Sequence, residues 1–420
     1  MIPIISTTGT KGKTSVIRAI HAVISADSGT FLRVDTEGAW IDGKLLISHD
    51  DSKALWGLAP ANSPGRFITL LADKPGNRVA VLENNLFSSK ACGLGYSTHS
   101  VGVFTNVFED HMGADSSLQS SEDIAKAKSF IFSRVRDQGY VVFNADDDLV
   151  KGQLHQLPQK KTIHTVGCSV AQDGDQIEAE YKLFLDSDSH VILSGPAGKN
   201  RGLGSINEFA MYVPGFMPSA HNVLFVIGAV LGHYQGVIDE DVLTRIKQYR
   251  PSDVDGRLAI FSTEKGVRII FDYAHEKQSL KAISELARTY SPNGKVIGVV
   301  RLSPTRTDEL IVDTAKAIAQ DFDTFIVYDK IDGVTRTPDD QLNPFKLEKV
   351  GYTAEVFTDA LNKAGASKVI KELVEHNAIN LAAQLAKPGD TVVYIQGNSA
   401  EQSLTLLKKN FGNSVERISQ

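Results

Sequence analysis

Short, uninterrupted apolar runs alternate along this chain with longer stretches whose apolar residues recur at helical spacing. The first run covers residues 2–5, and a helical pattern follows at residues 15–24. Continuous apolar runs are typical of strands buried on both faces, and their alternation with helices predicts an α/β fold with a parallel sheet. The further strands of the first half are predicted at residues 30–34, 78–82, 101–105 and 140–143.

Two helices and one irregular stretch complete this half of the chain. Residues 124–135 repeat apolar positions at helical spacing after a Ser-Ser-Glu-Asp start at residues 120–123, which is a capping pattern. The longest apolar stretch, residues 223–231, predicts a buried helix and is too short to cross a bilayer. Residues 35–66 mix glycine and proline with other residues and predict loops and short pieces.

The length of 420 residues exceeds what one core usually supports, so at least two domains are expected. Short alternating runs at about residues 160–215 predict a small β-rich insertion. A boundary is predicted near residues 246–258, which gives a first domain of residues 1–250 and a second of residues 251–420. The second domain has a Rossmann-like α/β alternation without a G-x-G-x-x-G loop, so NAD is not implied. Its strands are predicted at residues 267–271, 295–300, 324–328 and 391–395, and its helices at residues 277–290, 308–319, 367–385 and 403–409.

Composition and charge narrow the classes of partner. The net charge of −6 and the pI of about 6.0 argue against nucleic acid or an anionic membrane as the main partner, whereas an anionic nucleotide needs only a local positive pocket. Cys92 and Cys168 have no C-x-x-C spacing, so neither a disulfide framework nor a zinc site is expected. This cysteine usage predicts a reducing, cytoplasmic compartment, and no signal peptide is visible after Met1.

A glycine-rich segment joins the first predicted strand to the first predicted helix. Its glycines allow positive φ and a close approach, so that successive N–H groups and the positive end of the helix can face an anion. Lys13 is expected to reach the β- and γ-phosphates of a nucleotide, and the Thr14 hydroxyl to hold Mg²⁺. Thr7 stands where the general phosphate loop has its first glycine, so the match is to a G-T-x-G-K-T variant; a turn without a ligand is the alternative. The segment reads Gly9-Thr10-Lys11-Gly12-Lys13-Thr14.

Polar residues follow two further strands of the predicted sheet. Glu83 ends the strand at residues 78–82, and Asn106 follows the strand at residues 101–105, with His111 close behind. Because the carboxyl ends of parallel strands meet at one edge of the sheet, we expect Thr14, Glu83 and His111 to converge there. The alternatives are a solvated carboxylate at Glu83 and a structural role for His111, since neutral imidazole is an unusual ligand for Mg²⁺.

Three other polar positions carry open alternatives. Lys126 and Lys128 differ by about 200° around a helix, so at least one of them is expected to face solvent. Residues 144–148 form a polar turn that either caps the next segment or contacts the nucleotide. Asn222, at the head of the apolar helix, is either a helix cap or a ligand contact.

Taken in order, these motifs resemble those of the Mur ligase superfamily, the ATP-dependent acid–amino-acid ligases. Residues 9–14 resemble its ATP loop, Glu83 its first metal carboxylate, and residues 105–111 its TN…DH motif with a metal-linked histidine. Lys128 resembles the lysine that many members carry as a carbamate bridging a second Mg²⁺.

The resemblance continues towards the C-terminus. Asn222, after His221, resembles the asparagine that contacts adenine, and Arg257 resembles the interdomain arginine that grips ATP. Asp272-Tyr273-Ala274-His275 resembles the DYAH hinge motif. The family usually continues with Asn-Pro, but this chain has Glu276-Lys277, which leaves the local hinge contacts open.

Within the superfamily, the sequence resembles most the Mur-like module of cyanophycin synthetase. The resemblance is carried by residues 101–132, 139–147 and 305–309. Because the loop begins at residue 9, we expect neither an ATP-grasp half nor an N-terminal UDP-sugar domain before it.

The resemblance implies an ADP-forming carbon–nitrogen ligase that uses ATP and Mg²⁺ to join a carboxylate to an amino acid or other amine through an acyl phosphate. A folylpolyglutamate-type ligase, a non-catalytic nucleotide-binding regulator of the same fold and a phosphotransferase with the same loop are the alternatives. The acid, the amine and the oligomeric state are not indicated. The implied catalytic residues are Lys13, His111 and Lys128; the metal ligands are Thr14, Glu83, His111 and Lys128; and the nucleotide contacts are Gly9, Thr10, Lys11, Gly12, Lys13, Thr14, Asn106, Asn222, Arg257, Asp272 and His275.

Overall fold

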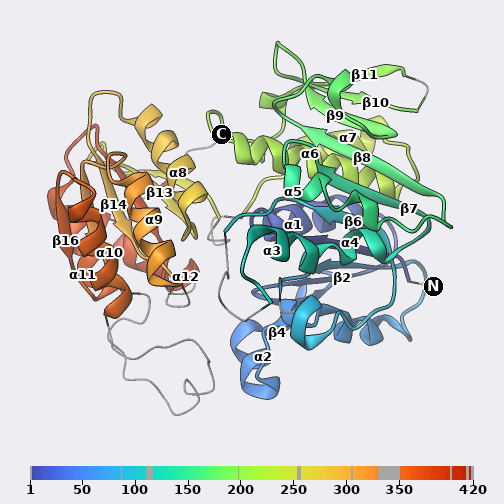
Figure 1. Ribbon diagram of the computed structural model, residues 1–420, viewed down its shortest axis with the longest axis horizontal. Helices are drawn as coiled ribbons and strands as arrows, with labels where there is room; N and C mark the ends of the chain where they lie inside the picture. The colour runs from blue at the N-terminus through green and yellow to red at the C-terminus, as the bar shows by residue number, and fades with distance from the viewer. Residues whose placement is uncertain are drawn as a thin grey trace. The chain divides into compact units, whose positions relative to one another are not determined.

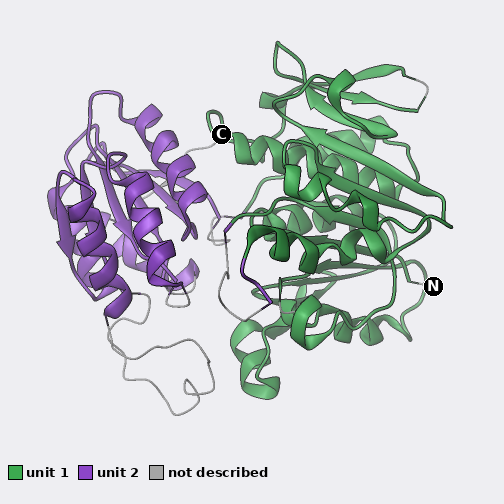
Figure 2. Cartoon of the chain, viewed as in Figure 1, with its two compact units in different colours: residues 1–108, 120–251 green, residues 109–119, 252–420 purple. Residues whose placement is uncertain are grey.

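The computed structural model divides the chain into two compact units, shown in different colours in Figure 2. The first unit comprises residues 1–108 and 120–251, and the second comprises residues 109–119 and 252–420. The structure describes residues 2–86, 88–109, 117–196, 198–252, 257–303, 306–329, 351–397, 400–412 and 416–417.

An 11-stranded sheet forms the centre of the first unit (Figure 1). Seven neighbouring strands, from β9 through β8, β7, β6, β1 and β5 to β2, run parallel, and an antiparallel pair flanks them at each edge. Strand β1, which leads into the glycine-rich segment, therefore lies between β5 and β6, the strands that lead to Glu83 and Asn106. The strands are β1 Ile4–Thr8, β2 Thr30–Asp35, β3 Gly38–Ile41, β4 Lys44–Ser48, β5 Arg78–Glu83, β6 His99–Phe104, β7 Val135–Asn144, β8 Ile163–Ser169, β9 Tyr181–Leu185, β10 His190–Ser194 and β11 Asn200–Ser205.

Successive residues of β1 pack on opposite faces of this sheet, as strand geometry requires. Ile5 belongs to the larger core, which α1 and α6 cover, whereas Ile4 belongs to a smaller core beneath the 3-10 segment Pro64–Leu71. The apolar helix α6 is buried over most of its length, as its sequence predicts. Among the described helices, none is both long and apolar enough to cross a membrane. The helices of this unit are α1 Lys13–Ile24, α2 His49–Trp56, α3 Ser121–Lys128, α4 Phe130–Ser133, α5 Asp148–Lys151, α6 Met217–His233 and α7 Glu240–Gln248.

Three stretches of the first unit differ from the sequence-based expectation in detail. The single helix expected at residues 124–135 ends at Lys128; after α4, Val135 already opens β7. Residues 130–132 are all buried, so they lack the solvent-facing side that would continue an amphipathic helix. The β-rich segment at residues 160–215 is present, and its strands extend the main sheet instead of forming a sheet of their own. Residues 35–66 contain the β3–β4 hairpin and α2.

The second unit is an α/β layer around a seven-stranded sheet of order β16-β15-β14-β17-β13-β12-β18. The strands β13 to β17 are parallel, and β12 and β18 pair antiparallel at one edge. Its core contains Phe271, Val299 and Tyr394, one from each of three neighbouring strands. The strands are β12 Ala259–Ser262, β13 Arg268–Asp272, β14 Val296–Val300, β15 Thr324–Val327, β16 Val369–Lys371, β17 Thr391–Ile395 and β18 Glu416–Arg417, and the helices are α8 Lys277–Tyr290, α9 Asp308–Ile318, α10 Tyr352–Lys363, α11 Glu375–Leu385 and α12 Ala400–Phe411.

One helix predicted in this unit is wrong over its first eight residues. The helix expected at residues 367–385 begins only at Glu375, because Val369 and Ile370 form the edge strand β16 and pair with β15. Both residues are β-branched and suit a strand better than a helix. The preceding helix α10 is not indicated by the sequence pattern that we used.

Candidate functional site

Two glycines shape the turn between β1 and α1. Gly9 has φ of 142° and Gly12 has φ of 83°, and both values lie in the region that favours glycine. A Cβ atom at Gly9 would overlap Thr105 Oγ1, and one at Gly12 would lie 2.5 Å from Asn222 Oδ1. The loop backbone therefore lies directly against Thr105 at the end of β6 and against Asn222 in the first turns of α6.

The residues that follow β6 hold the loop from one side. The Lys11 amide donates to Asn106 Oδ1 at 2.8 Å, and the Lys11 carbonyl accepts from Thr105 Oγ1 at 2.6 Å and from Asn106 Nδ2 at 3.2 Å. The Thr10 amide donates to the Asn106 carbonyl at 2.9 Å, and Thr10 Oγ1 accepts from the Phe108 amide at 3.0 Å. Asn106, which the sequence assigned to the nucleotide, thus binds the loop backbone with its side-chain amide.

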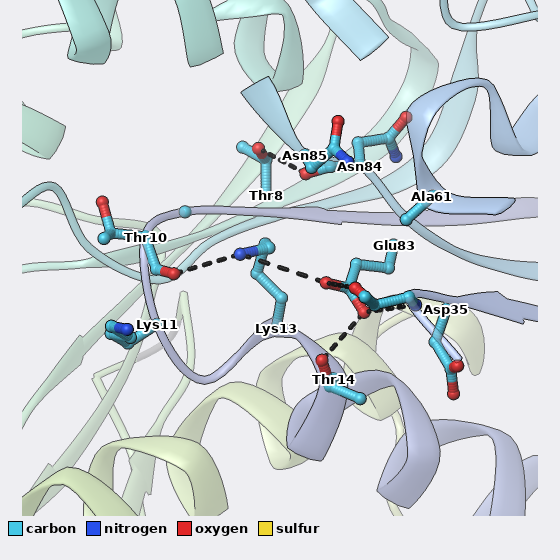
Figure 3. A network of polar contacts seen from close by, with 12 residues as sticks. Thr8, Thr10, Lys11, Lys13, Thr14, Asp35, Ala61, Glu83, Asn84 and Asn85 are labelled. Carbon is cyan, nitrogen blue, oxygen red and sulfur yellow. Dashed lines mark hydrogen bonds and ion pairs between the residues drawn. The ribbon is translucent and has the colours of Figure 1, made fainter. Parts of the chain in front are cut away.

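Lys13, Thr14 and Glu83 come together at the start of α1 (Figure 3). Thr14 Oγ1 donates to Glu83 Oε2 at 2.9 Å. Lys13 Nζ donates to the Thr10 carbonyl at 3.0 Å and lies 4.0 Å from Glu83 Oε1. The Lys13 side chain is 14% exposed and the Glu83 side chain 3% exposed, so the opposite charges meet where water screens them little. The expected convergence of Thr14 and Glu83 is present in the structure.

Lys128 approaches the same loop from α3. Its Nζ donates to the Gly9 carbonyl at 2.8 Å, and the residue is only 4% exposed. Lys126, two positions earlier, is exposed. The helical geometry that separated the two lysines in the sequence therefore directs Lys128 towards the loop and Lys126 towards solvent. His111 lies outside the described residues.

The donor set fits a magnesium nucleotide. Thr14 and Glu83 offer a hydroxyl and a carboxylate, the hard oxygen ligands that Mg²⁺ prefers, and the remaining ligands of such a site are usually phosphate oxygens and water. Lys13 and the N-terminus of α1 offer positive charge to phosphate. Within the described ranges, no three His, Cys, Asp or Glu residues are grouped as a metal site.

The polar turn at residues 144–148 is used for internal contacts. Asp147 accepts from the amides of Leu149 and Val150 at the start of α5 and from the Val107 amide at 2.8 Å. Burial raises the pKa of the Asp147 carboxyl above its ordinary value despite these bonds. Asp146 accepts from His221 Nε2 at 2.9 Å and so ties the end of β7 to the head of α6. This turn therefore supports Val107 and His221, which adjoin Asn106 and Asn222.

The hydrogen bonds around Asp146 also settle its charge state. Burial acts to raise the pKa of its carboxyl, but hydrogen bonds from His221, Ser169 and the Val170 amide outweigh burial and hold the pKa below its ordinary value. Asp146 is consequently a carboxylate at neutral pH and a constant acceptor for His221.

The other three predicted nucleotide contacts lie in the second unit, at the carboxyl end of β13. The Arg257 guanidinium lies 4.7 Å from the centre of the Tyr273 ring, and the buried Arg301 lies 4.7 Å from the same ring. Asp272 Oδ2 accepts from the Leu258 amide at 2.7 Å, and His275 Nδ1 donates to the Tyr273 carbonyl at 2.8 Å. These residues are grouped with one another, and their role towards a nucleotide stays a prediction.

The departure at Glu276-Lys277 has a local structural use. Glu276 is fully buried and caps α8 by accepting from the amides of Gln278 at 2.8 Å and Ser279 at 2.9 Å. Lys277 Nζ contacts Asp313 at 2.9 Å and Glu109 at 3.2 Å. Glu276 therefore caps the N-terminus of α8, a role for which Asn is also well suited.

Sequence reasoning missed Thr36, which lies at the end of β2 and hydrogen-bonds Glu83. A signal was available, because Thr36 follows the strand predicted at residues 30–34 as Glu83 follows the one at residues 78–82. A threonine hydroxyl is a weaker sign of a functional site than a carboxylate. Thr36 also lies in the irregular stretch that begins at residue 35, for which only loops and short pieces are predicted.

Two family models match the chain. The Mur ligase middle domain matches residues 7–229, which is more than half of the 420 residues, and the Mur ligase glutamate ligase domain matches residues 256–395. The chain belongs to the Mur ligase family. The first match begins within β1 and contains the loop, Glu83, Lys128 and Asn222; the second contains Arg257, Asp272 and His275.

Relatives with curated names include two kinds of ligase. Cyanophycin synthetase of Nostoc sp. (strain PCC 7120) is 25% identical over 411 residues, which cover 97% of this Mur ligase chain and 42% of the relative. UDP-N-acetylmuramoyl-L-alanyl-D-glutamate–2,6-diaminopimelate ligase of Bacteroides thetaiotaomicron is 24% identical over 418 residues, which cover 97% of this chain and 76% of the relative. The chain thus spans less than half the length of the cyanophycin synthetases that it matches.

Solved structures with a similar fold include two that contain ADP. FolC of E. coli, in complex with DHPP and ADP, aligns with a TM-score of 0.65 at 16% identity, covering 97% of this chain and 89% of FolC. Folylpolyglutamate synthase of Mycobacterium tuberculosis, complexed with ADP and AMPPCP, aligns with a TM-score of 0.64 at 19% identity, covering 97% and 91%. At these identities the likeness supports the fold.

Proposed function

We propose that this Mur ligase chain joins a carboxylate to an amine at the expense of ATP, with ADP and phosphate as products. The observation that carries the proposal is the group formed by Lys13, Thr14 and Glu83 beneath a glycine-shaped loop, with Lys128 buried against that loop. A carboxylate is too poor an electrophile for an amine, so it would first take the γ-phosphoryl group as an acyl phosphate. The amine would then attack the acyl carbon, lose a proton, and displace phosphate.

Each residue of this group has a distinct task in the proposal. Lys13 and the N–H groups at the start of α1 would hold the β- and γ-phosphates and stabilise the charge that develops during transfer. Thr14 and Glu83 would hold Mg²⁺, which supplies charge neutralisation at the phosphate oxygens when bound. His111 and a carbamylated Lys128 would serve a second Mg²⁺, as the family resemblance implies.

Other residues would place the nucleotide and the loop. Asn222, whose side chain touches Gly12, would contact the adenine. Asn106 would keep the loop open to phosphate by holding both polar groups of Lys11. Arg257, Asp272 and His275 would bring the second unit to the nucleotide and exclude water from the acyl phosphate.

The substrate class follows from the relatives. An amino acid or a short peptide with a free carboxylate is the proposed acid, and an amino acid or other amine is the proposed acceptor, because cyanophycin synthetases and a diaminopimelate ligase are among the matching proteins. A folylpolyglutamate-type activity is supported only by the likeness of fold and is the second candidate.

Product analysis tests the proposal. The purified chain is incubated with ATP, Mg²⁺ and pairs of candidate acids and amines, and ADP, phosphate and new amides are measured by chromatography and mass spectrometry. We expect ADP release that requires both partners of a productive pair, and loss of that release in Lys13→Met. Cleavage of ATP to AMP and pyrophosphate, or stimulated ADP release without an amide for any pair, would contradict the ligase assignment. Release that depends on a pteroate acceptor would favour the second candidate.

A further inference from the structure

Thr36 binds the carboxylate of Glu83 with two donors. Its Oγ1 donates to Glu83 Oε1 at 3.0 Å, and its amide donates to Glu83 Oε2 at 3.3 Å. Thr14 Oγ1 donates to Oε2 as well, at 2.9 Å. Thr36, at the end of β2, therefore hydrogen-bonds both oxygens of the carboxylate, and Thr14, on α1, hydrogen-bonds one of them.

The segment that carries Thr36 is fixed at the Asp35 side chain and at the carbonyl of Thr36 itself. Asp35, fully buried, accepts from Arg18 Nε at 2.9 Å, and Arg18 lies one turn after Thr14 on α1. The Thr36 carbonyl accepts from His49 Nδ1 at 2.7 Å, at the start of α2. The end of β2 is consequently tied to the helix of the phosphate loop and to α2, which makes it a rigid support for a side chain.

Charge explains why Glu83 needs such a support. Its Oε1 accepts from Thr36 Oγ1, and the Lys13 ammonium lies only 4.0 Å away. In a site this buried, a carboxylate released from Thr36 would gain by turning towards Lys13. That movement would withdraw Glu83 from the metal position beside Thr14 and occupy the lysine that phosphate requires.

We propose that Thr36 is a positioning residue that holds Glu83 in the orientation that binds Mg²⁺. The inference deepens the proposed function and rests on the part of it that assigns a magnesium nucleotide to the loop. Thr36 acts through Glu83, so its loss weakens binding of Mg²⁺ with the nucleotide much more than binding of the nucleotide alone. Partners that orient a metal ligand typically account for about 10-fold to 100-fold in metal affinity.

The test measures ADP binding by titration calorimetry at increasing Mg²⁺ and, separately, in EDTA. Thr36→Val removes the hydroxyl at nearly constant volume, Thr36→Ala removes it with less bulk, and Thr36→Ser restores it. Thr30→Val is the matched control, because Thr30 is a buried threonine at the opposite end of β2. The Mg²⁺ concentration that gives half of the gain in ADP affinity should rise about 10-fold in the valine and alanine variants and stay near the parent value in the serine and Thr30 variants.

The outcomes separate the positioning role from a merely structural one. An unchanged Mg²⁺ midpoint in Thr36→Val, or an equal loss of ADP affinity with Mg²⁺ and with EDTA, overturns the inference. If Thr36→Val does not fold, as judged by circular dichroism, the same criteria apply to Thr36→Ala, and Thr36→Ser should still keep the parent midpoint. A parent chain that binds ADP in a Mg²⁺-dependent way while the variants match it refutes only the role of Thr36, whereas a parent chain that binds no ADP refutes the nucleotide site itself.

Discussion

Lys128 donates from a buried side chain to the Gly9 carbonyl, whereas Lys126, on the same helix, faces solvent. The two residues have the same side chain and lie two positions apart, so they differ mainly in burial. Lys126 is therefore a matched comparison for Lys128. Carbamylation would turn the Lys128 side chain from a cation into an anion beside the phosphate loop, where a metal ion can use the added oxygens.

Replacement of Lys128 by alanine is expected to lower turnover by about 100-fold, since a group that stabilises developing charge is lost. Acetate or formate should restore part of the activity by standing in for the missing carbamate. The measurement is ADP release with a productive pair of substrates, and Lys126→Ala serves as the control. Full activity in Lys128→Ala, or failure of every short carboxylate to restore any activity, would remove the carbamate from the proposal.

At this scale the sequence was informative where a side chain had distinctive chemistry. Gly9, Gly12, Lys13, Thr14 and Glu83 could be predicted as a group because loop, helix start and strand end each leave a local pattern. The contacts of Asn106 with the loop backbone could not be predicted, because they join residues 95 positions apart in the chain. The position of Thr36 after a predicted strand is visible in the sequence, but its hydrogen bonds to Glu83 depend on how β2 lies beside β5.

Among the elements, helix α8 shows most clearly how the structure accommodates a residue that departs from the family motif, here Glu276. The buried carboxylate of Glu276 accepts from two amides of the first turn, and Ser279 also donates to it through its hydroxyl. A side-chain acceptor at this position satisfies amides that no helical carbonyl can reach.

Glu276→Ala is expected to destabilise the second unit by about 1 kcal/mol, and Glu276→Asn to cost less, because asparagine is a good capping residue. Hydrogen exchange should show faster exchange of the Gln278 and Ser279 amides in the alanine variant. Glu285→Ala is the matched control, since Glu285 is exposed in the middle of the same helix. Equal exchange rates at these amides in the Glu276→Ala and Glu285→Ala variants would contradict the capping role.

Strands buried on both faces were the elements that the sequence predicted best, and β17 matches its expected range residue for residue. Helix α8 also matches its expected range. Two of the exceptions, β16 and the β3–β4 hairpin, lie at sheet edges. The apolar pattern does not separate strand β16 from helix α11, because the few apolar residues of β16 precede α11 without a visible break. The β3–β4 hairpin was not seen, because an edge strand such as β4 need not bury its side chains, and Leu45 and Leu46 are exposed.

On the scale of the whole molecule, buried histidines give the first unit a dependence on pH. Burial lowers the pKa of His99 to about 4 and that of His21 to about 4. His99 Nε2 donates to the Ile131 carbonyl at 2.9 Å, and its Nδ1 has no hydrogen-bond partner among the described residues. Both rings are therefore neutral in the folded chain at neutral pH, and protonation of either would bury an uncompensated charge.

The free energy of unfolding should fall as the pH drops from about 6.5 to 4, because the unfolded chain then binds protons that the folded chain excludes. Between pH 7 and pH 5 each histidine should account for a loss on the order of 1 to 2 kcal/mol. Urea unfolding at several pH values measures the effect. His99→Gln should reduce the dependence, and His155→Gln, at an exposed position, should leave it unchanged. A stability that is constant over this range would show that the two rings titrate normally.

The glycine loop between β1 and α1 also has a consequence for the synthesis of the chain. The loop is made before Thr105 and Asn106, which follow only after β6, and before Asn222, which follows only after all strands of the 11-stranded sheet. A nascent chain shorter than this carries the loop without the neighbours that shape it. Under the proposed function, nucleotide binding would therefore require that Asn222 has been made, and nucleotide at 100 times its dissociation constant would stabilise the first unit by about 2.7 kcal/mol.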